Sequence, residues 1–81
     1  MKQSIALRFF INTFLDRLTR TDSELSELVA VGQANHNHYV ELKAAHKEAL
    51  LAESYLSRGE YFEAEQRLEN GRRIYDLMKP F

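Results

Sequence analysis

Apolar residues along this chain recur every three to four positions in three successive segments, which is the spacing that places them on one face of an α-helix. The first segment predicts a helix over about residues 4–19. Its stripe consists of Leu7, Phe10, Ile11, Phe14 and Leu18. Ile5, Phe9 and Leu15 widen the apolar surface beyond one face, so we expect this helix to be covered on more than one side.

The polar stretch Thr19–Ser23 predicts the first break between helices. Thr21 followed by Glu24 has the form of a capping box, in which a side-chain oxygen accepts a backbone N–H that the first helical turn leaves unpaired. Asp22 is the alternative capping residue. A second helix is therefore expected to begin at about residue 23.

The second apolar stripe continues from that point and predicts one long helix over about residues 23–57. Gly32 and the polar stretch Gln33–His38 are unfavourable in a helix, so we expect the helix to bend near residues 32–37. The alternative is two separate helices, over about residues 23–31 and 36–57.

Gly59 predicts the second break, because glycine readily adopts the left-handed conformation that ends many helices. A third helix is expected over about residues 60–78, with a stripe that consists of Tyr61, Ala64, Leu68, Gly71, Tyr75 and Met78. The sequence thus predicts an all-α fold in one domain, residues 1–81. We expect an antiparallel helical hairpin and an N-terminal helix that packs across it or is exchanged with a second copy.

Within this hairpin, large, small and aromatic residues follow a regular spacing, namely Leu51, Ala52, Tyr55, Gly59, Tyr61, Ala64, Leu68 and Gly71. Residues 51–71 are similar to one repeat of the tetratricopeptide family. The resemblance implies an antiparallel hairpin with close helix contact at Ala64, and it implies protein binding. Gly71 stands where alanine is usual in that family, and no proline follows at the usual place.

The repeat-like pattern occurs once, whereas stacked arrays of such repeats need about three copies to bury a continuous core. The resemblance therefore covers a single hairpin and does not extend to an array. Close packing in an unrelated helical hairpin is the alternative explanation of the same spacing.

Size and cysteine content bear on how such a fold is stabilised. The 81 residues allow only one small core, and the chain has no cysteine with which disulfides or thiolate metal sites would reinforce it. Association is the remaining means of reinforcement, so we expect a homo-oligomer, with a dimer favoured. Because cysteine-free chains suit a reducing compartment, a cytoplasmic location is also expected.

The charge distribution bears on possible nucleic-acid and membrane partners. A net charge of −1 creates no long-range field that would attract nucleic acid. A nucleic-acid surface would have to use the basic residues of the third helix, which are Arg67, Arg72, Arg73 and Lys79. Acidic residues alternate with them, so DNA or RNA binding is kept as an alternative. A membrane-surface role for Ile5–Leu18 is a second alternative, since this segment is too short to span a bilayer.

No residue pattern predicts catalysis, because the chain lacks a cysteine nucleophile, a Gly-x-Ser-x-Gly turn and a phosphate-binding glycine loop. His36 and His38 would lie about 200° apart on a helix and could not share a metal ion. His38 with Glu41, or with His46, is better placed, but the paired Glu-x-x-His motifs of di-iron bundles are missing. We therefore expect no enzymatic activity, no cofactor and no metal.

Aromatic residues are more numerous than one small core needs, and surplus aromatic residues often anchor interfaces. The predicted protein interface comprises Phe9, Phe10, Phe14, Leu18, Tyr39, Leu42 and Phe62. It combines the N-terminal helix with the Tyr39–Leu56 region. The expected function is that of a small non-catalytic protein-binding module, such as an adaptor, an inhibitor or a small chaperone of bacterial or phage type, whose partner the sequence does not name.

Overall fold

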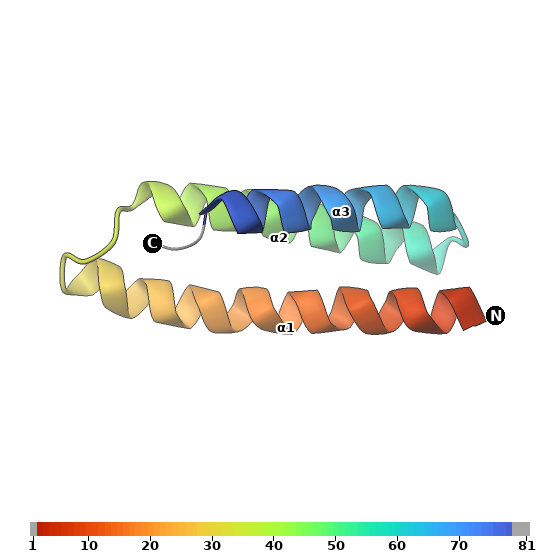
Figure 1. Cartoon of the computed structure of the whole chain (residues 1–81), viewed down its shortest axis with the longest axis horizontal. Helices are drawn as coiled ribbons and strands as arrows, with labels where there is room; N and C mark the ends of the chain where they lie inside the picture. The colour runs from red at the N-terminus through yellow and green to blue at the C-terminus, as the bar shows by residue number, and fades with distance from the viewer. Residues whose placement is uncertain (1, 79–81) are drawn as a thin grey trace.

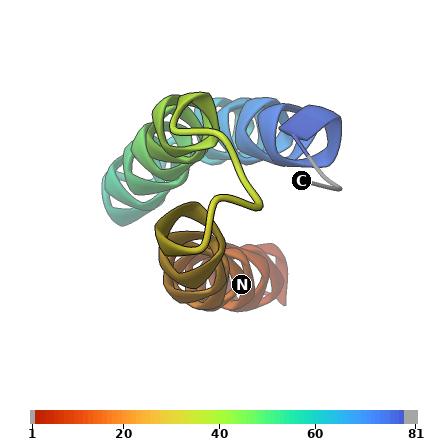
Figure 2. The same cartoon turned by 90° about the vertical axis from the view of Figure 1, so that its left-hand side faces the viewer.

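A computed structural model describes residues 2–78 as three α-helices: α1 (Lys2–Ala30), α2 (Asn37–Ser57) and α3 (Tyr61–Met78). Successive helices run antiparallel along the long axis, and α1 lies beneath a layer formed by α2 and α3 (Figures 1 and 2). The described part of the chain contains no strand. The predicted all-α fold, a helical hairpin preceded by an N-terminal helix, is confirmed.

The predicted break at Thr19–Ser23 is wrong, because α1 continues without interruption through this stretch. The Thr21 hydroxyl does not cap a new helix. It donates to the carbonyl oxygen of Arg17, one turn back, at 2.9 Å, and Ser26 does the same with Asp22 at 3.0 Å. Hydroxyl side chains inside a helix often bond in this way, so residues that favour caps can also occupy a helix interior.

Gly32 ends α1 and does not merely bend a longer helix. Its φ of 75° lies in the left-handed region. The N–H groups of Gly32 and Gln33 bond to the carbonyl oxygens of Val29 at 3.1 Å and Leu28 at 2.8 Å, the two bonds of a Schellman motif. The single helix over 23–57 is therefore wrong. The alternative of two helices placed the second one, over about residues 36–57, correctly, since α2 begins at Asn37. At this start the Asn35 side chain accepts the backbone N–H of Asn37 at 2.8 Å.

The turn between α2 and α3 was predicted correctly. Gly59 has a φ of 79°, its N–H bonds to Leu56, and the N–H of Glu60 bonds to Tyr55, so α2 also ends in a Schellman motif. Arg58 spans this turn, with its guanidinium 4.6 Å from the centre of the Tyr55 ring and 3.2 Å from Glu60. The hairpin is thus closed tightly at this end.

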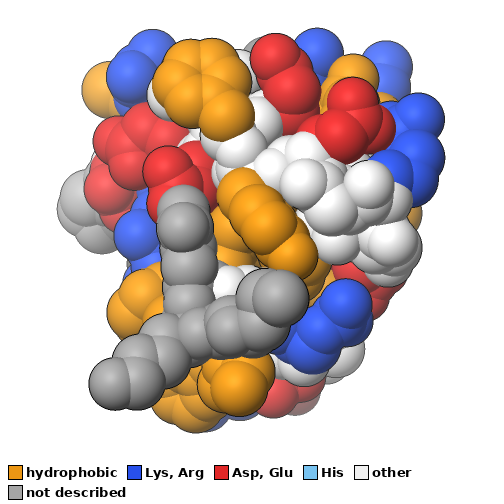
Figure 3. Space-filling model, turned by 90° about the vertical axis from the view of Figure 1, so that its right-hand side faces the viewer, with side chains coloured by type: hydrophobic (Ala, Val, Ile, Leu, Met, Phe, Trp, Pro, Cys, Tyr) orange, Lys and Arg blue, Asp and Glu red, His pale blue; other side chains and the backbone are white. Residues whose placement is uncertain are grey.

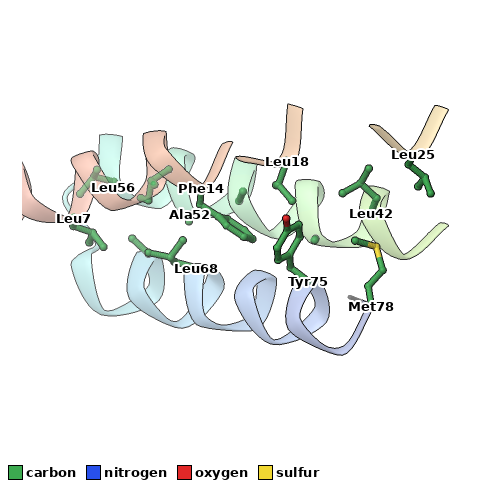
Figure 4. Packing of buried hydrophobic residues seen from close by; sticks show 14 residues of the cluster. Leu7, Phe14, Leu18, Leu25, Leu42, Ala52, Leu56, Leu68, Tyr75 and Met78 are labelled. Atoms are coloured by element: carbon green, nitrogen blue, oxygen red, sulfur yellow. The ribbon is translucent and has the colours of Figure 1, made fainter. Parts of the chain in front are cut away.

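The core is built from large side chains of all three helices, and the hairpin adds small ones at its alanines (Figure 4). Its buried members are Leu7, Ile11, Phe14, Leu18, Leu25, Leu42, Ala45, Ala49, Ala52, Leu56, Ala64, Leu68, Tyr75 and Met78. The small residues bring α3 close to its neighbours: a Cβ added to Gly71 would lie 3.0 Å from the Phe14 ring and 3.2 Å from the carbonyl oxygen of Ala45. Gly71 is therefore one position at which the three helices meet.

One buried hydrogen bond joins α1 to α3. The Thr21 and Tyr75 hydroxyl oxygens are 2.7 Å apart, and because the Thr21 proton is used on Arg17, Tyr75 donates to Thr21. The Tyr75 ring also packs edge-to-face on Phe14, with centroids 5.9 Å apart. These contacts fix the rotation of α1, which packs mainly on α2 and meets α3 more sparsely.

Candidate protein-binding surface

The predicted interface residues fall into two groups. Phe14, Leu18 and Leu42 lie in the core, with exposed fractions of 2%, 1% and 4%, so the prediction that they lie on a surface is wrong. The reason is that α1 buries one continuous stripe over its whole length, and this stripe needs both Phe14 and Leu18 to reach the hairpin. Leu42 faces the same seam from α2. Within the Tyr39–Leu56 region, Leu42 and the small residues Ala45, Ala49 and Ala52 are buried together with Leu56, and the other residues are partly or fully exposed.

Phe9 and Phe10, in contrast, are 63% and 47% exposed, and Ile5 beside them is 72% exposed. The two phenylalanine rings pack edge-to-face, with centroids 5.9 Å apart. Ile5 and Phe9 are four residues apart and so share one helix face, which turns away from the core residues Leu7 and Ile11. We call Ile5, Phe9 and Phe10 the N-terminal patch.

The N-terminal patch is within the size range of the largest apolar patches on monomeric proteins. An aromatic side chain offers about 150–250 Å² of surface, so the three exposed fractions correspond to roughly 350 Å² of apolar surface. Contiguous apolar patches of about 300–600 Å² are often functional when they occur on monomeric proteins. Both aromatic members belong to the interface that the sequence predicts, whereas Ile5 does not, although its i, i+4 spacing from Phe9 is the signal that would have included it.

A shallow groove between α1 and α3 adjoins the patch. Its volume is about 320 Å³, and its lining consists of Leu7, Phe10, Glu65, Gln66, Leu68, Glu69 and Arg72. The guanidinium carbon of Arg72 lies 5.7 Å from the centre of the Phe10 ring. The groove therefore has an apolar floor and a charged α3 wall. Figure 3 views this end of the molecule, where hydrophobic side chains reach the surface among acidic and basic ones.

Tyr39 and Phe62 lie apart from each other. Tyr39 is partly buried near the 31–36 connection, where its hydroxyl donates to Ser26 at 2.7 Å and its ring lies 5.6 Å from that of His36. Phe62 is 69% exposed in the first turn of α3, at the end of the molecule where α1 begins (Figure 1). Tyr39 therefore has a structural role in this copy, and Phe62 is exposed at the same end as the N-terminal patch.

Other large apolar side chains are exposed at separate places on α2, on α3 and in the connection after α1. They are Val31, Val40, Leu50 and Leu77, of which Leu77 is the most exposed at 82%. Leu50 lines a shallow surface hollow with Lys43, His46 and Lys47 of the same helix. Single exposed apolar residues are ordinary on protein surfaces. These positions provide controls for experiments on the patch.

The basic residues of α3 point in different directions. Arg67 lies against α2, where its guanidinium donates to the Glu48 carboxylate at 3.2 Å. This hydrogen bond and the negative charge of Glu48 raise the pKa of Arg67 above its ordinary value. Arg72 lies at the groove beside Phe10, and Arg73 is exposed about 100° further round the helix. Lys79 lies outside the described residues. The described arginines thus do not share one face.

The three histidines are dispersed as well. His38 contacts the Asn35 backbone through its Nδ1 atom, at 3.0 Å from the carbonyl oxygen, and His36 contacts Tyr39. His46 borders a hollow between α1 and α2 that Asp22 and Lys43 also line. Within residues 2–78, no group of three acidic, histidine or cysteine side chains is placed to hold a metal ion. His36 and His38 thus make local contacts around the 31–36 connection, whereas His46 lies at a surface hollow.

Comparison with known proteins gives no match: no family model, no curated protein and no solved structure is similar to this chain. None of the three helices, over the part of the chain that is described, is both long and apolar enough to cross a membrane.

Proposed function

We propose that this chain is a small non-catalytic protein-binding module, an adaptor, inhibitor or small chaperone of bacterial or phage type, that acts through the N-terminal patch in the cytoplasm. The observation that supports this proposal is the exposure of Ile5, Phe9 and Phe10 beside a well-packed core. One helix contributes a buried stripe to its own fold and a second apolar face to solvent.

The energetics favour occupation of this face. Removing about 350 Å² of apolar surface from water is worth roughly 9 kcal/mol at about 25 cal/mol per Å². Association costs of about 4–15 kcal/mol offset much of that gain, so the patch supports binding when charged or hydrogen-bonding contacts at its rim contribute too. Phe9 and Phe10, as neighbouring aromatic rings, match the composition of binding hot spots.

The alternatives have less support from the geometry. The hollows among the described residues are shallow, and Arg67, which a nucleic-acid surface would need, is already paired with Glu48. A docking role therefore agrees better with the side chains than catalysis or nucleic-acid binding does.

Co-purification from the native host tests this function. A tagged wild-type chain is expected to retain a defined protein partner, another copy of the chain included, through washes at moderate salt. Phe9→Asp is expected to lose that partner, because a carboxylate would be buried without a counter-charge. Leu77→Asp is the matched control, since Leu77 is even more exposed but belongs to α3 and not to the patch.

Two results would overturn the proposal. One is equal recovery of every partner by wild type and Phe9→Asp. The other is a salt-dependent shift of DNA that the Arg72→Ala/Arg73→Ala double variant abolishes while protein partners are absent. Circular dichroism of both aspartate variants shows that the comparison involves folded proteins.

A further inference from the structure

Charge and apolar surface follow a fixed order around the first turns of α1. Successive residues of a helix are separated by about 100°, so Arg8 lies on one side of Phe9 and Phe10 on the other. Ile5 falls between Arg8 and Phe9 by the same rule. Around α1, Arg8 is therefore followed by the apolar strip of Ile5 and Phe9, and then by Phe10 at the groove that α3 borders. Arg8 is exposed and forms no ion pair within residues 2–78.

The α3 side of this groove supplies the opposite charge. Glu69 is exposed there and forms no ion pair among the described residues, and Glu65 lines the same wall one turn earlier. Arg72 is the base on this wall, and its guanidinium is placed over the Phe10 ring. Glu65 and Glu69 give this wall two carboxylates and Arg72 gives it one guanidinium, so its formal charge is negative. The surface thus changes from basic through apolar to acidic across the width of the molecule.

A surface of this kind is complementary to itself. If two copies meet at a two-fold axis that runs roughly along α1, the basic edge of each copy lies on the acidic edge of the other, and the apolar strips meet between them. The sequence adds to this match, because residues 1–15 contain two basic residues and no acidic one.

The area also fits. Two patches of about 350 Å² provide about 700 Å² of apolar surface, which is the apolar share of an interface of about 1,200 Å² in total. That is the lower end of the range for specific protein interfaces.

We infer that the N-terminal patch binds a second copy of this chain, in an isologous dimer in which Arg8 of each copy lies against Glu69 of the other. This inference rests on the proposed protein-binding function and names its partner. The dimer buries Ile5, Phe9 and Phe10 of both copies, and the two ion pairs at its edges determine its register.

Sedimentation velocity from micromolar to millimolar concentration tests the inference. The wild-type chain is expected to change from monomer to dimer as its concentration rises, and Phe9→Asp is expected to stay monomeric. Arg8→Glu and Glu69→Lys each place like charges together twice per dimer. Since an exposed ion pair is worth up to about 1 kcal/mol, each variant is expected to weaken the dimer about tenfold or more.

Mixing these two charge variants tests the pairing of Arg8 with Glu69 across the dimer most directly. The glutamate that replaces Arg8 in one variant would face the lysine that replaces Glu69 in the other. The second pair of the dimer would keep its original arginine and glutamate, so the mixture is expected to form a heterodimer with nearly wild-type affinity. Each variant alone would remain largely monomeric at the same concentration. Leu77→Asp is the control that should dimerise as the wild type does.

The inference is overturned if the wild-type chain is monomeric throughout, if Phe9→Asp dimerises unchanged, or if mixing restores nothing. A monomeric wild type would contradict the dimer but not the general protein-binding function, which the co-purification test addresses separately. If that test finds a foreign partner that Phe9→Asp loses, the general function is supported without the dimer. The two failures are therefore distinguishable.

Discussion

Replacing Gly71 by alanine tests the packing of the three helices. The new methyl group would lie 3.0 Å from the Phe14 ring, 3.2 Å from the carbonyl oxygen of Ala45 and 3.4 Å from Cβ of Glu48. The Phe14 ring is held against Tyr75, which is itself hydrogen-bonded to α1, and the Ala45 oxygen belongs to the α2 backbone. The Ala45 oxygen therefore cannot move without displacing the α2 backbone, and a shift of the Phe14 ring would disturb its contact with Tyr75.

Two opposing effects determine the free energy of unfolding of this variant. Alanine in place of glycine stabilises a helix by about 1 kcal/mol, and burying one methyl group adds up to about 0.8 kcal/mol. Overpacking of a filled core costs about 1–3 kcal/mol. Because one of the close contacts is with backbone, we place the cost of Gly71→Ala near the upper limit and expect a net loss of about 1 kcal/mol.

Urea denaturation followed by circular dichroism measures this loss, which for a domain of this size also lowers the melting temperature by about 4–8 °C. The Phe14→Leu variant provides a double-mutant cycle: with a smaller side chain at position 14, the penalty of Gly71→Ala should decrease. If the Gly71→Ala protein is more stable than the wild type, the three helices are not closely packed at this position, and the predicted overpacking is wrong.

Three further predictions concern other parts of the chain. Tyr75→Phe removes the hydrogen bond to Thr21 and should reduce stability by about 0.5–1.5 kcal/mol, whereas a melting curve identical to wild type would show that this bond contributes nothing. Gly59→Ala meets no neighbouring atom but places a Cβ at positive φ, so chemical denaturation should show a loss of about 1–2 kcal/mol, and an unchanged midpoint would contradict the backbone argument. Phe9→Asp should change stability by no more than about 0.5 kcal/mol, while Phe14→Asp should unfold the chain, and equal effects in thermal melts would mean that the two residues do not differ in burial as described.

The sequence was sufficient to predict three features of the fold: the helical class, the Gly59 turn and the third helix. In the third helix the apolar stripe and the flanking glycine agree, and both act locally. The break at Thr19–Ser23 was predicted wrongly because its decisive contact is remote: Thr21 is buried against Tyr75, 54 positions away. Cap-forming residues and buried hydroxyl residues have the same local composition, and no local pattern separates them.

The Gly32 error has a different origin. The 3-4 spacing of the stripe continues across residues 31–36 through Gly32 and Asn35, although neither is apolar, so spacing alone favours a single helix. Only the two Schellman hydrogen bonds, together with the positive φ of Gly32, show that α1 ends there. Glycine near a helix end is compatible with both outcomes at the sequence level, and packing of α1 back onto α2 determines which is formed.

The candidate surface was predicted in part. Phe9 lies outside the predicted stripe of the first helix, and its exposure agrees with that local argument, whereas Phe10 belongs to the predicted stripe and is nevertheless half exposed. Phe14, Leu18 and Leu42 were named with them because the depth of the core could not be estimated before the helices were placed. The acidic wall at Glu69 and its relation to Arg8 depend on how α3 lies beside α1, so this relation could not be predicted from either segment alone.

Because the chain has no cysteine, a single cysteine at position 9 provides the most direct test of the account. In dilute purified protein, the thiol of Phe9→Cys should react rapidly with a maleimide reagent, as should that of Leu77→Cys. In intact host cells a partner should cover the N-terminal patch, so we expect the thiol at position 9 to be protected while the thiol at position 77 still reacts. Equal, rapid labelling of both positions in the cell would contradict the claim that the N-terminal patch is a binding surface.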